Sequence, residues 1–367
     1  MTTADTAQPE RIEVRTSSRR STIVVGEGVL AGLATWLDVA GVGPRRFVVS
    51  NKKVWGLHGA TIQRALGDVP VILVPDGERY KTVRTTEHIY EGLIRGGADR
   101  GSAVVAVGGG VVGDMAGFAA ASFLRGITLA HVPTTLLAQV DSSIGGKVGV
   151  NHALGKNLIG AFHQPAVVVT DPTVLATLPR REFRSGLFEV VKYGMIASRP
   201  LFDRLRTSTR ALFARDASVL LPAIAESVRI KAEVVSADER ESGLRRILNF
   251  GHTVGHALEA VTHYRRFRHG EAIGYGMLAA ADLAVVRGVL PDADRKLLAQ
   301  LIGKLGSLPP VADLSIAEIL DAVRRDKKVV NGRLHFVLCT AIGTTIVVDD
   351  VTEDELKAAL VRLGLAS

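Results

Sequence analysis

The chain has 367 residues, of which 47% are hydrophobic, and a formal net charge of +8. A chain of this length can bury a sizeable core and form two domains, so disorder of the whole is excluded. Its longest apolar runs, residues 103–107 and 166–169, are too short to span a membrane. The N-terminal residues lack the basic and apolar regions of a secretory signal, so we expect a cytoplasmic protein without a membrane partner.

The cysteine count and the charge limit the possible sites and partners. Cys339 is the single cysteine of the sequence, which excludes an internal disulfide and requires any metal to use histidine and carboxylate. The positive charge suits nucleic acid, an acidic surface or a multiply anionic small substrate. The basic residues are scattered, and their densest run, residues 264–269, is typical of a solvated loop. We therefore expect no nucleic acid partner.

Strand and helix patterns alternate in the first half of the chain. Residues 47–49, 71–74, 103–107 and 127–132 are short apolar runs rich in valine and isoleucine, and residues 82–95 have helical spacing. This alternation predicts a parallel sheet with helices on its faces. We expect an α/β fold whose first domain, residues 1–178, is Rossmann-like, which is a nucleotide-binding architecture by analogy only.

The pattern changes at about residue 179 to long amphipathic helices, for example 221–237, 253–260 and 271–287. Near the end, residues 334–339 and 345–348 predict a hairpin. Thr352 and Glu355 then form the capping box of a last helix. We expect a mainly helical second domain, residues 179–367.

A glycine-rich turn, GGGVVGD at residues 108–114, follows the strand that ends at residue 107. Glycines let a backbone approach a pyrophosphate closely, and a helix N-terminus offers N–H groups to anionic oxygens. The turn departs from the usual dinucleotide fingerprint, so a purely structural turn is the alternative.

Two further segments suit cofactor binding. Thr134 and Thr135 follow a strand end, where ligands of parallel sheets gather, although helix capping would explain one of them. The charged loop Asp76-Gly77-Glu78-Arg79-Tyr80-Lys81 is suited to the adenosine end of a cofactor, or is a solvated surface loop.

The stretch formed by residues 141–151 and 155–157 combines lysines, amides and many glycines without an apolar period. We expect a loop that wraps a polyhydroxylated anion, because ammonium and backbone N–H groups would converge there. A flexible connector is the alternative.

Three separated places suggest a metal site: Glu189, the pair His252 and His256, and His269. Histidines at i and i+4 share a helix face, and two imidazoles with one carboxylate leave room for substrate hydroxyls. The residue after His252 is threonine, which argues against a metalloprotease of the H-E-x-x-H kind. Spacing leaves open whether His256 or His269 is the second imidazole ligand.

From about Ile23 to the C-terminus the chain resembles the sugar phosphate cyclase family, specifically its 3-dehydroquinate synthase members. Five long motifs carry the resemblance in this order: GGGVVGD, PTTLLAQVDSSIGGKVGVNHALGKNLIGAFHQP, EVVKYG, ILNFGHTVGHALE and HGEAIGYGM. Chance matches to all five are not credible.

The resemblance implies that the first domain binds NAD and that the second domain binds the substrate and a divalent metal, zinc or cobalt. It assigns the metal to Glu189, His252 and His269 and leaves His256 as an acid/base or hydrogen-bonding group. It assigns NAD to Glu78, Lys81, Gly109, Gly110, Val111, Asp114, Thr134, Thr135 and Thr177. We also expect Asp76, Lys147 and Lys156, from the two polar loops described above, at NAD.

The resemblance also implies a phosphorylated sugar-acid substrate and a homodimer. Arg125 matches an arginine that the family lends across a dimer interface to the substrate phosphate. The expected substrate residues are Asp141, Lys147, Lys156, Asn157, Lys192, Lys231, Arg245, Asn249, His256 and Lys327.

The implied reaction converts 3-deoxy-D-arabino-heptulosonate 7-phosphate to 3-dehydroquinate and phosphate, a lyase step of aromatic amino acid biosynthesis by the shikimate pathway. It proceeds by transient oxidation, phosphate elimination, reduction and intramolecular aldol closure. The alternatives are another sugar phosphate cyclase, acting on a substrate without a carboxylate, and a metal-dependent polyol dehydrogenase that releases NADH. A basic nucleic-acid-binding protein is the alternative from another class.

Overall fold

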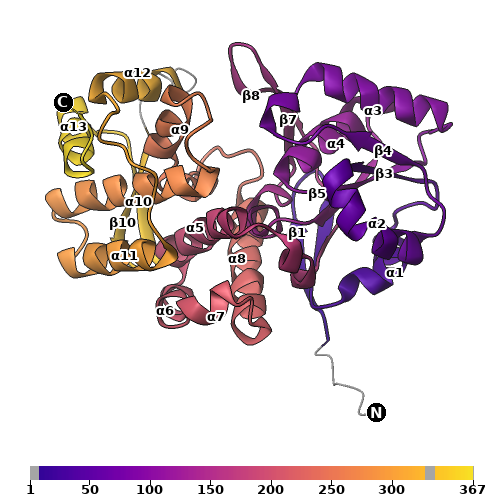
Figure 1. Cartoon of the computed structure of the whole chain (residues 1–367), viewed down its shortest axis with the longest axis horizontal. Helices are drawn as coiled ribbons and strands as arrows, with labels where there is room; N and C mark the ends of the chain where they lie inside the picture. The colour runs from indigo at the N-terminus through magenta and orange to yellow at the C-terminus, as the bar shows by residue number, and fades with distance from the viewer. Residues whose placement is uncertain (1–7, 327–334, 367) are drawn as a thin grey trace. The chain divides into compact units, whose positions relative to one another are not determined.

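The computed structural model describes residues 8–326 and 335–366, and the predicted site residue Lys327 lies outside them. Contacts divide the chain into two compact units (Figure 1). Unit 1 runs to Pro179 and includes Leu220–Arg240, and unit 2 comprises Arg180–Val219 and the chain from Glu241 onward. The predicted domain boundary after residue 178 did not anticipate that residues 220–240 return to unit 1, and it stays a prediction.

Unit 1 is built on a seven-stranded sheet. Neighbouring strands run parallel except at the edge, where β1 and β2 are antiparallel. In sheet order the strands are β1 (Glu10–Arg15), β2 (Arg20–Val25), β9 (Val167–Thr170), β6 (Thr128–Pro133), β5 (Ala103–Gly108), β3 (Arg46–Asn51) and β4 (Val71–Val74).

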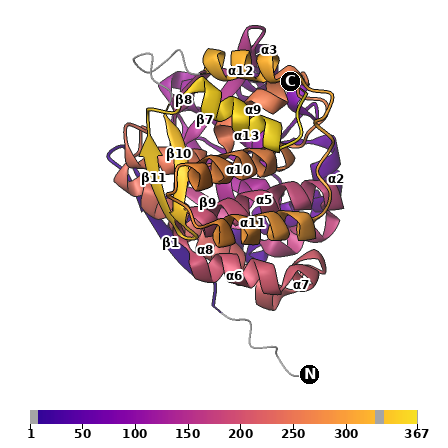
Figure 2. The same ribbon diagram turned by 90° about the vertical axis from the view of Figure 1, so that its left-hand side faces the viewer.

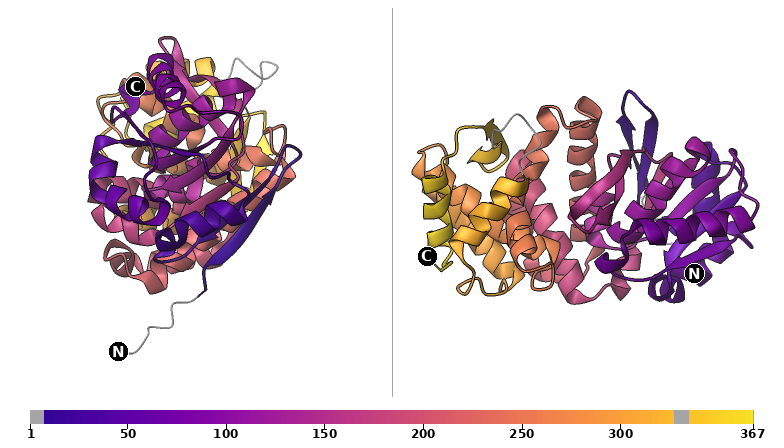
Figure 3. Two further views of the ribbon diagram at one scale, coloured as in Figure 1. Left: turned by 90° about the vertical axis from the view of Figure 1, so that its right-hand side faces the viewer. Right: turned by 90° about the horizontal axis from the view of Figure 1, so that it is seen from above.

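Both faces of this sheet are covered, because successive side chains of a strand point to opposite faces. Phe47, Val49 and Val104 join one buried cluster with residues of helices α3 and α4, whereas Val48 and Val105 join another with residues of α1 and α2. The ribbons of these helices lie beside the sheet (Figures 1 and 3). The covering helices are α1 (Leu33–Val39), α2 (Lys52–Leu66), α3 (Val83–Arg95) and α4 (Gly110–Ser122). Burial on both faces explains the nearly continuous apolar runs of these strands.

The glycine- and lysine-rich stretch that the sequence predicted as a loop is mostly regular structure. A turn of π-helix, η4 (Ala138–Ser142), leads to a hairpin of β7 (Lys147–His152) and β8 (Gly155–Phe162). The loop prediction was wrong because glycines mask the alternation of the strands. A Cβ on Gly160 would lie 2.4 Å from a backbone carbonyl oxygen of the opposite strand, so the close pairing needs glycine.

Unit 2 surrounds one helix, α10, with other helices and a short hairpin (Figure 2). Contacts to α10 come from α5, α9, α11, α13 and β10. The helices are α5 (Arg180–Ala197), α6 (Arg199–Thr207), α7 (Thr209–Phe213), α9 (His252–Val261), α10 (His269–Val286), α11 (Asp292–Leu305), α12 (Ile316–Asp326) and α13 (Glu353–Arg362), and α8 (Ala217–Ala237) leads back to unit 1. The hairpin is β10 (Phe336–Ala341) with β11 (Thr344–Val348), and 3-10 turns lie at η5 (Pro172–Thr177) in unit 1 and η6 (Leu244–Asn249) in unit 2.

The predicted fold class is confirmed: a mostly parallel N-terminal sheet is followed by a mainly helical part. The predicted capping box of the last helix is also present, because the hydroxyl of Thr352 and the carboxylate of Glu355 cap each other's backbone. Within residues 8–326 and 335–366, no helix is long and apolar enough to cross a membrane.

Glycines bring α10 into close contact with its neighbours. A Cβ on Gly270 would lie 1.9 Å from the carbonyl oxygen of Ser185 in α5. A Cβ on Gly276 would lie 1.7 Å from the carbonyl oxygen of Gly251, which precedes α9. Both distances are far below van der Waals contact, so the spacing of α5, α9 and α10 depends on these two glycines.

A buried carboxylate, Glu271, ties α10 to α5. Arg181 donates to both of its oxygens, at 2.9 and 2.7 Å, and Arg184 donates to one of them. The backbone N–H of Arg268 also donates to Glu271, at 2.8 Å, which caps the first turn of α10. Burial alone would raise the pKa of Glu271, but these hydrogen bonds hold it below its usual value of 4.5.

We expect Gly276→Ala to lower the stability of the chain by about 1–3 kcal/mol or more, because the added methyl group meets backbone atoms that cannot rotate away. Gly303→Ala in α11 is the matched control, since nothing lies within 4 Å of its Cβ position. That control should be neutral or more stable by up to about 1 kcal/mol. Urea unfolding measures both, and an unchanged midpoint for Gly276→Ala would contradict the close contact.

We expect Glu271→Gln to cost about 3 kcal/mol at pH 7, the lower end for a broken buried pair, because both guanidinium groups keep some contact with water. The folded-state pKa of Glu271 is lowered, so its contribution is complete above pH 4.5 and is lost as the pH falls through that lowered pKa. The stability difference between wild type and variant should therefore shrink below pH 4.5. A difference that stays constant with pH argues against the ion pairs.

Candidate active site

In unit 1 the glycine turn of β5 and α4 forms a cradle beside the end of β6. Gly109 precedes α4 and provides no side-chain cap, so the first N–H groups of the helix are available to an anion. A Cβ on Gly109 would lie 2.9 Å from Thr135, and one on Gly110 would lie 2.8 Å from the hydroxyl of Ser142. The structure therefore brings the predicted Gly109, Gly110 and Thr135 together, and a larger side chain would fill the cradle.

Val111 lies in the first turn of α4. At the end of β6, the N–H of Thr134 donates to the carbonyl of Gly108 at 2.9 Å. The hydroxyl of Thr135 accepts from the N–H of Ala138 at 3.2 Å. One threonine thus closes the strand pairing, and the other caps the following helical turn.

A buried lysine, Lys81, joins two of the predicted residues. Its ammonium group donates to the carboxylate of Asp114, in the second turn of α4, and to the side-chain oxygen of Asn157. Burial raises the pKa of Asp114 to about 6, although the Lys81 charge opposes this. Asn157 adopts a left-handed conformation with φ 55°, at the start of β8.

The charged loop after β4 is held by two asparagines. Asn51 caps α2 and donates to the carboxylate of Asp76 at 3.1 Å. Asn151 donates to the carboxylate of Glu78 at 2.8 Å and accepts from the N–H of Asn157 at 2.9 Å. Glu78 also lies 3.8 Å from the ammonium group of Lys156, so this loop and the β7–β8 hairpin are connected.

The other predicted residues of unit 1 lie on several elements. The buried Lys231 of α8 donates to the carboxylate and the carbonyl of Asp141, both at 2.6 Å. Lys147 begins β7 with an exposed side chain, and Arg125 is exposed after α4 with φ 70°. The hydroxyl of Thr177, in η5, lies 3.1 Å from the imidazole of His58.

In unit 2 three predicted ligands converge from three helices. Glu189 comes from the middle of α5, His252 from the start of α9 and His269 from the start of α10. Nε2 of His252 lies 3.6 Å and Nε2 of His269 lies 3.3 Å from the same Glu189 oxygen. The three ligand atoms are within 4.8 Å of one another, which fits a divalent cation bound by one carboxylate and two imidazoles.

The pKa values of the two imidazoles, His252 and His269, shift in opposite directions. Burial lowers the pKa of His252 to about 3, although Glu189 opposes this. Burial also lowers the pKa of His269, but the carboxylates of Glu259 and Glu189 outweigh it and raise the value to about 10. Burial therefore favours the neutral form of His252, whereas the two carboxylates favour the charged form of His269.

The remaining predicted residues of unit 2 border this group or lie near it in the chain. The buried ammonium group of Lys192 lies 2.6 Å from the second Glu189 oxygen. The His256 ring is centred 5.2 Å from that of His252. In η6, Arg245 is buried, and Asn249 donates to the carboxylate of Glu241 at 2.6 Å.

Sequence reasoning missed Glu259 and Asn151. Glu259 lies three residues after His256 and seven after His252, so its helical position already placed it on their face. Its role was overlooked because a glutamate in an amphipathic helix is usually solvated. Asn151 stood inside a quoted motif, but nothing in the pattern singled it out as the residue that connects Glu78 and Asn157.

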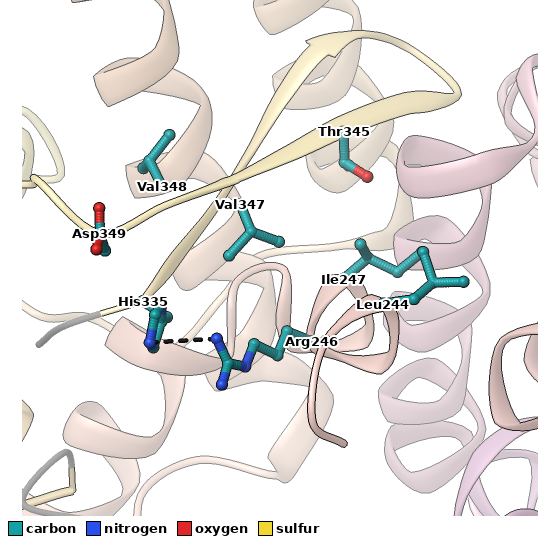
Figure 4. Close-up of a pocket in the computed structure, with 9 residues that line it drawn as sticks. Leu244, Arg246, Ile247, His335, Thr345, Val347, Val348 and Asp349 are labelled. Carbon is teal, nitrogen blue, oxygen red and sulfur yellow. Dashed lines mark hydrogen bonds between the residues drawn. The ribbon is translucent and has the colours of Figure 1, made fainter. Parts of the chain in front are cut away.

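A separate surface depression lies beside η6 and the β10–β11 hairpin (Figure 4). Arg246 and His335 face each other in it, with side-chain nitrogens 3.2 Å apart. Thr345 and Val347 of the hairpin complete this part of its wall. None of its described lining residues is a predicted site residue, so it is not part of the candidate active site.

The sequence matches two family profiles that together cover more than half of the chain. They are described as 3-dehydroquinate synthase N-terminal, matched by residues 71–185, and 3-dehydroquinate synthase C-terminal, matched by residues 186–329. The 3-dehydroquinate synthase of Solibacter usitatus is 46% identical over 358 residues, which cover 96% of this chain and 99% of that protein.

Two solved structures with other names are also similar. ValA, a 2-epi-5-epi-valiolone synthase from Streptomyces hygroscopicus subsp. jinggangensis with NAD+ and Zn2+ bound, is 30% identical, with a TM-score of 0.86 over 93% of this chain and 96% of that one. A 2-deoxy-scyllo-inosose synthase complexed with carbaglucose-6-phosphate, NAD+ and Co2+ is 28% identical, with a TM-score of 0.83 over 96% and 99%. The matched profiles and the near full-length identity identify this chain as an enzyme of the 3-dehydroquinate synthase family.

Proposed function

We propose that the chain converts 3-deoxy-D-arabino-heptulosonate 7-phosphate to 3-dehydroquinate and phosphate with NAD and a divalent metal. The observation that carries the proposal is the group of Glu189, His252 and His269. These residues can bind a divalent metal, and the chain belongs to the 3-dehydroquinate synthase family. NAD bound in unit 1 would supply a reversible hydride acceptor, and a divalent ion held by Glu189, His252 and His269 would supply Lewis acidity.

In the proposed NAD site, the first turn of α4 binds the pyrophosphate with the N–H groups that follow Gly109. Three observations support this assignment: the absent side-chain cap, the small residues of the cradle and the hydroxyl of Thr135 beside it. The remaining NAD residues are proposed to be Asp76, Glu78, Lys81, Gly110, Val111, Asp114, Thr134, Lys147, Lys156 and Thr177.

In the proposed metal site, Glu189, His252 and His269 hold the ion. His256 lies beside the group formed by Glu189, His252 and His269 but is not a member of it. We therefore assign His256 a proton-transfer or hydrogen-bonding role toward the substrate. Lys192 keeps an ammonium group next to Glu189 and is proposed to orient a substrate oxygen.

The two anionic ends of the substrate need separate cations, because an unpaired buried charge is costly. Arg245, whose guanidinium is buried, and Lys327 are assigned to the carboxylate. Arg125 of a second copy is assigned to the phosphate, so we expect a homodimer. Asp141, Asn157, Lys231 and Asn249, together with Lys147 and Lys156, are proposed to bind the hydroxyls and the phosphate.

Two alternatives within enzymes remain. A cyclase for a substrate without a carboxylate is favoured by the structural likeness to the two synthases above, whereas the 46% identity to 3-dehydroquinate synthases and the buried Arg245 favour a sugar acid. A polyol dehydrogenase would release NADH, and the lysines of the β7–β8 hairpin favour a phosphorylated substrate instead.

We expect the chain, supplied with zinc and catalytic NAD, to release phosphate from the heptulosonate phosphate and to form 3-dehydroquinate. NAD should be required but not consumed. A phosphate assay, product identification by mass spectrometry and absorbance at 340 nm measure these outcomes. A stoichiometric rise in NADH would indicate the polyol dehydrogenase, and faster turnover of sedoheptulose 7-phosphate would indicate a different cyclase.

We expect a chelator to remove activity and zinc or cobalt to restore it. Glu189→Ala, His252→Ala and His269→Ala should each weaken metal binding by at least about 10- to 100-fold, since loss of an outer partner of a ligand already costs that much. His256→Ala should keep the metal and lose turnover. Metal content after dialysis is the measurement, and full metal content in the His252 variant contradicts the ligand assignment.

A further inference from the structure

Glu259 is a buried carboxylate that contacts one of the proposed ligands from behind. Its side chain is 7% exposed, and one of its oxygens lies 3.2 Å from Nδ1 of His269. The other nitrogen of the same ring, Nε2, lies 3.3 Å from Glu189. The His269 ring therefore has one carboxylate at each nitrogen, Glu189 at Nε2 and Glu259 at Nδ1.

The helices place Glu259 there by a simple spacing. His252, His256 and Glu259 occupy positions i, i+4 and i+7 of α9, which lie on one face of a helix. His269 is the first residue of α10, and the contact of Gly276 with Gly251 brings the two helices close together. Glu259 therefore meets His269 at the far end of the face that begins with His252.

We propose that Glu259 is a positioning residue for the metal site: its carboxylate accepts a hydrogen bond from the Nδ1–H of His269 and fixes the ring, which would direct the Nε2 lone pair toward a bound metal. This inference rests on the proposed metal site and adds a residue that does not touch the ion. A carboxylate behind an imidazole ligand also increases electron donation from the nitrogen that faces the metal. Water and salt would weaken the electrostatic interaction of a surface glutamate with the imidazole, whereas Glu259 is buried.

The other imidazole ligand is held differently. Nδ1 of His252 lies 3.2 Å from the carbonyl oxygen of Phe250, two residues earlier in the chain. That partner is neutral and comes from the local backbone, so it orients the ring without adding charge. The two imidazoles therefore differ in the partner of Nδ1, which is a neutral carbonyl for His252 and a carboxylate for His269.

A second metal ion held by His256, Glu259 and His269 is the competing interpretation, because their ligand atoms also lie within 4.8 Å of one another. His269 belongs to both groups and would have to ligate through both ring nitrogens. Such a bridging imidazole carries no proton on either nitrogen, whereas one ion on Nε2 leaves the Nδ1–H to donate to Glu259 at 3.2 Å. The structure therefore favours a hydrogen-bonded Glu259 over a ligating one.

The test compares Glu259→Ala and Glu259→Gln with wild type in the full-length chain. Zinc affinity is measured by competition with a chelator, and the cobalt-loaded protein gives the visible absorption of the metal site. We expect about 10- to 100-fold weaker zinc binding for Glu259→Ala, with an altered cobalt spectrum. Glu259→Gln keeps an acceptor oxygen but not the charge, so its loss should be smaller and its cobalt spectrum closer to wild type.

Two controls separate positioning from general damage. Glu318→Gln removes an exposed carboxylate from α12, in the same unit, and should leave zinc affinity and the cobalt spectrum unchanged. NAD affinity, measured by fluorescence quenching, should be unchanged in all variants. If Glu259→Ala does not fold, the nearly isosteric Glu259→Gln decides the question alone.

Wild-type zinc affinity together with a wild-type cobalt spectrum in the folded Glu259 variants would overturn the inference. Two zinc ions per wild-type chain, with one lost in the variants, would also overturn it by making Glu259 a ligand. If the wild-type chain itself binds no metal, the proposed function fails. Its failure is therefore distinguishable from that of the Glu259 inference.

Discussion

The candidate metal site depends on the interaction of the fully buried Glu189 carboxylate with the cationic groups around it. Transfer of an isolated carboxylate into a dry interior costs on the order of tens of kcal/mol, so cationic groups must surround it. Lys192 provides one positive charge at 2.6 Å, and His269 provides another because its pKa is raised. A metal that displaces the His269 proton replaces one positive charge with two. The Glu189 carboxylate therefore has cationic partners without a metal, and the group stays electrostatically suited to a divalent cation.

This electrostatic arrangement requires helices that approach more closely than ordinary side chains allow. Gly270 places the start of α10 against α5, and Gly276 places its middle against the turn before α9. Glu271 then binds Arg181 and Arg184 of α5, so the start of α10 is held both by contact and by charge. Each proposed ligand lies on a different helix, and small errors in helix spacing would move the ligand atoms apart.

The sequence predicted the fold class, most strands of the sheet and the residues of the metal group, because apolar periodicity and long motifs carry that information. It did not predict the β7–β8 hairpin, since paired glycines such as Gly149 and Gly160 have no side chains to alternate. It also left open the choice between His256 and His269 until the resemblance was considered. Spacing along the chain cannot show whether His256 of α9 or His269 of α10 turns toward Glu189. Contacts such as that of Glu259 with His269 depend on helix spacing and remain invisible in a pattern.

Buried lysines paired with carboxylates recur in both units. Lys81 contacts Asp114, and Lys231 contacts Asp141, both in unit 1. Lys192 contacts Glu189 in the same way in unit 2. Burial of an ammonium group without a partner is costly, so each carboxylate offsets the burial of its lysine when no ligand is bound. An anion that reaches such a lysine meets a cation already desolvated and held in place, which lowers the entropic cost of binding. It must also compete with the resident carboxylate, so these pairs favour strongly charged ligands over neutral sugars.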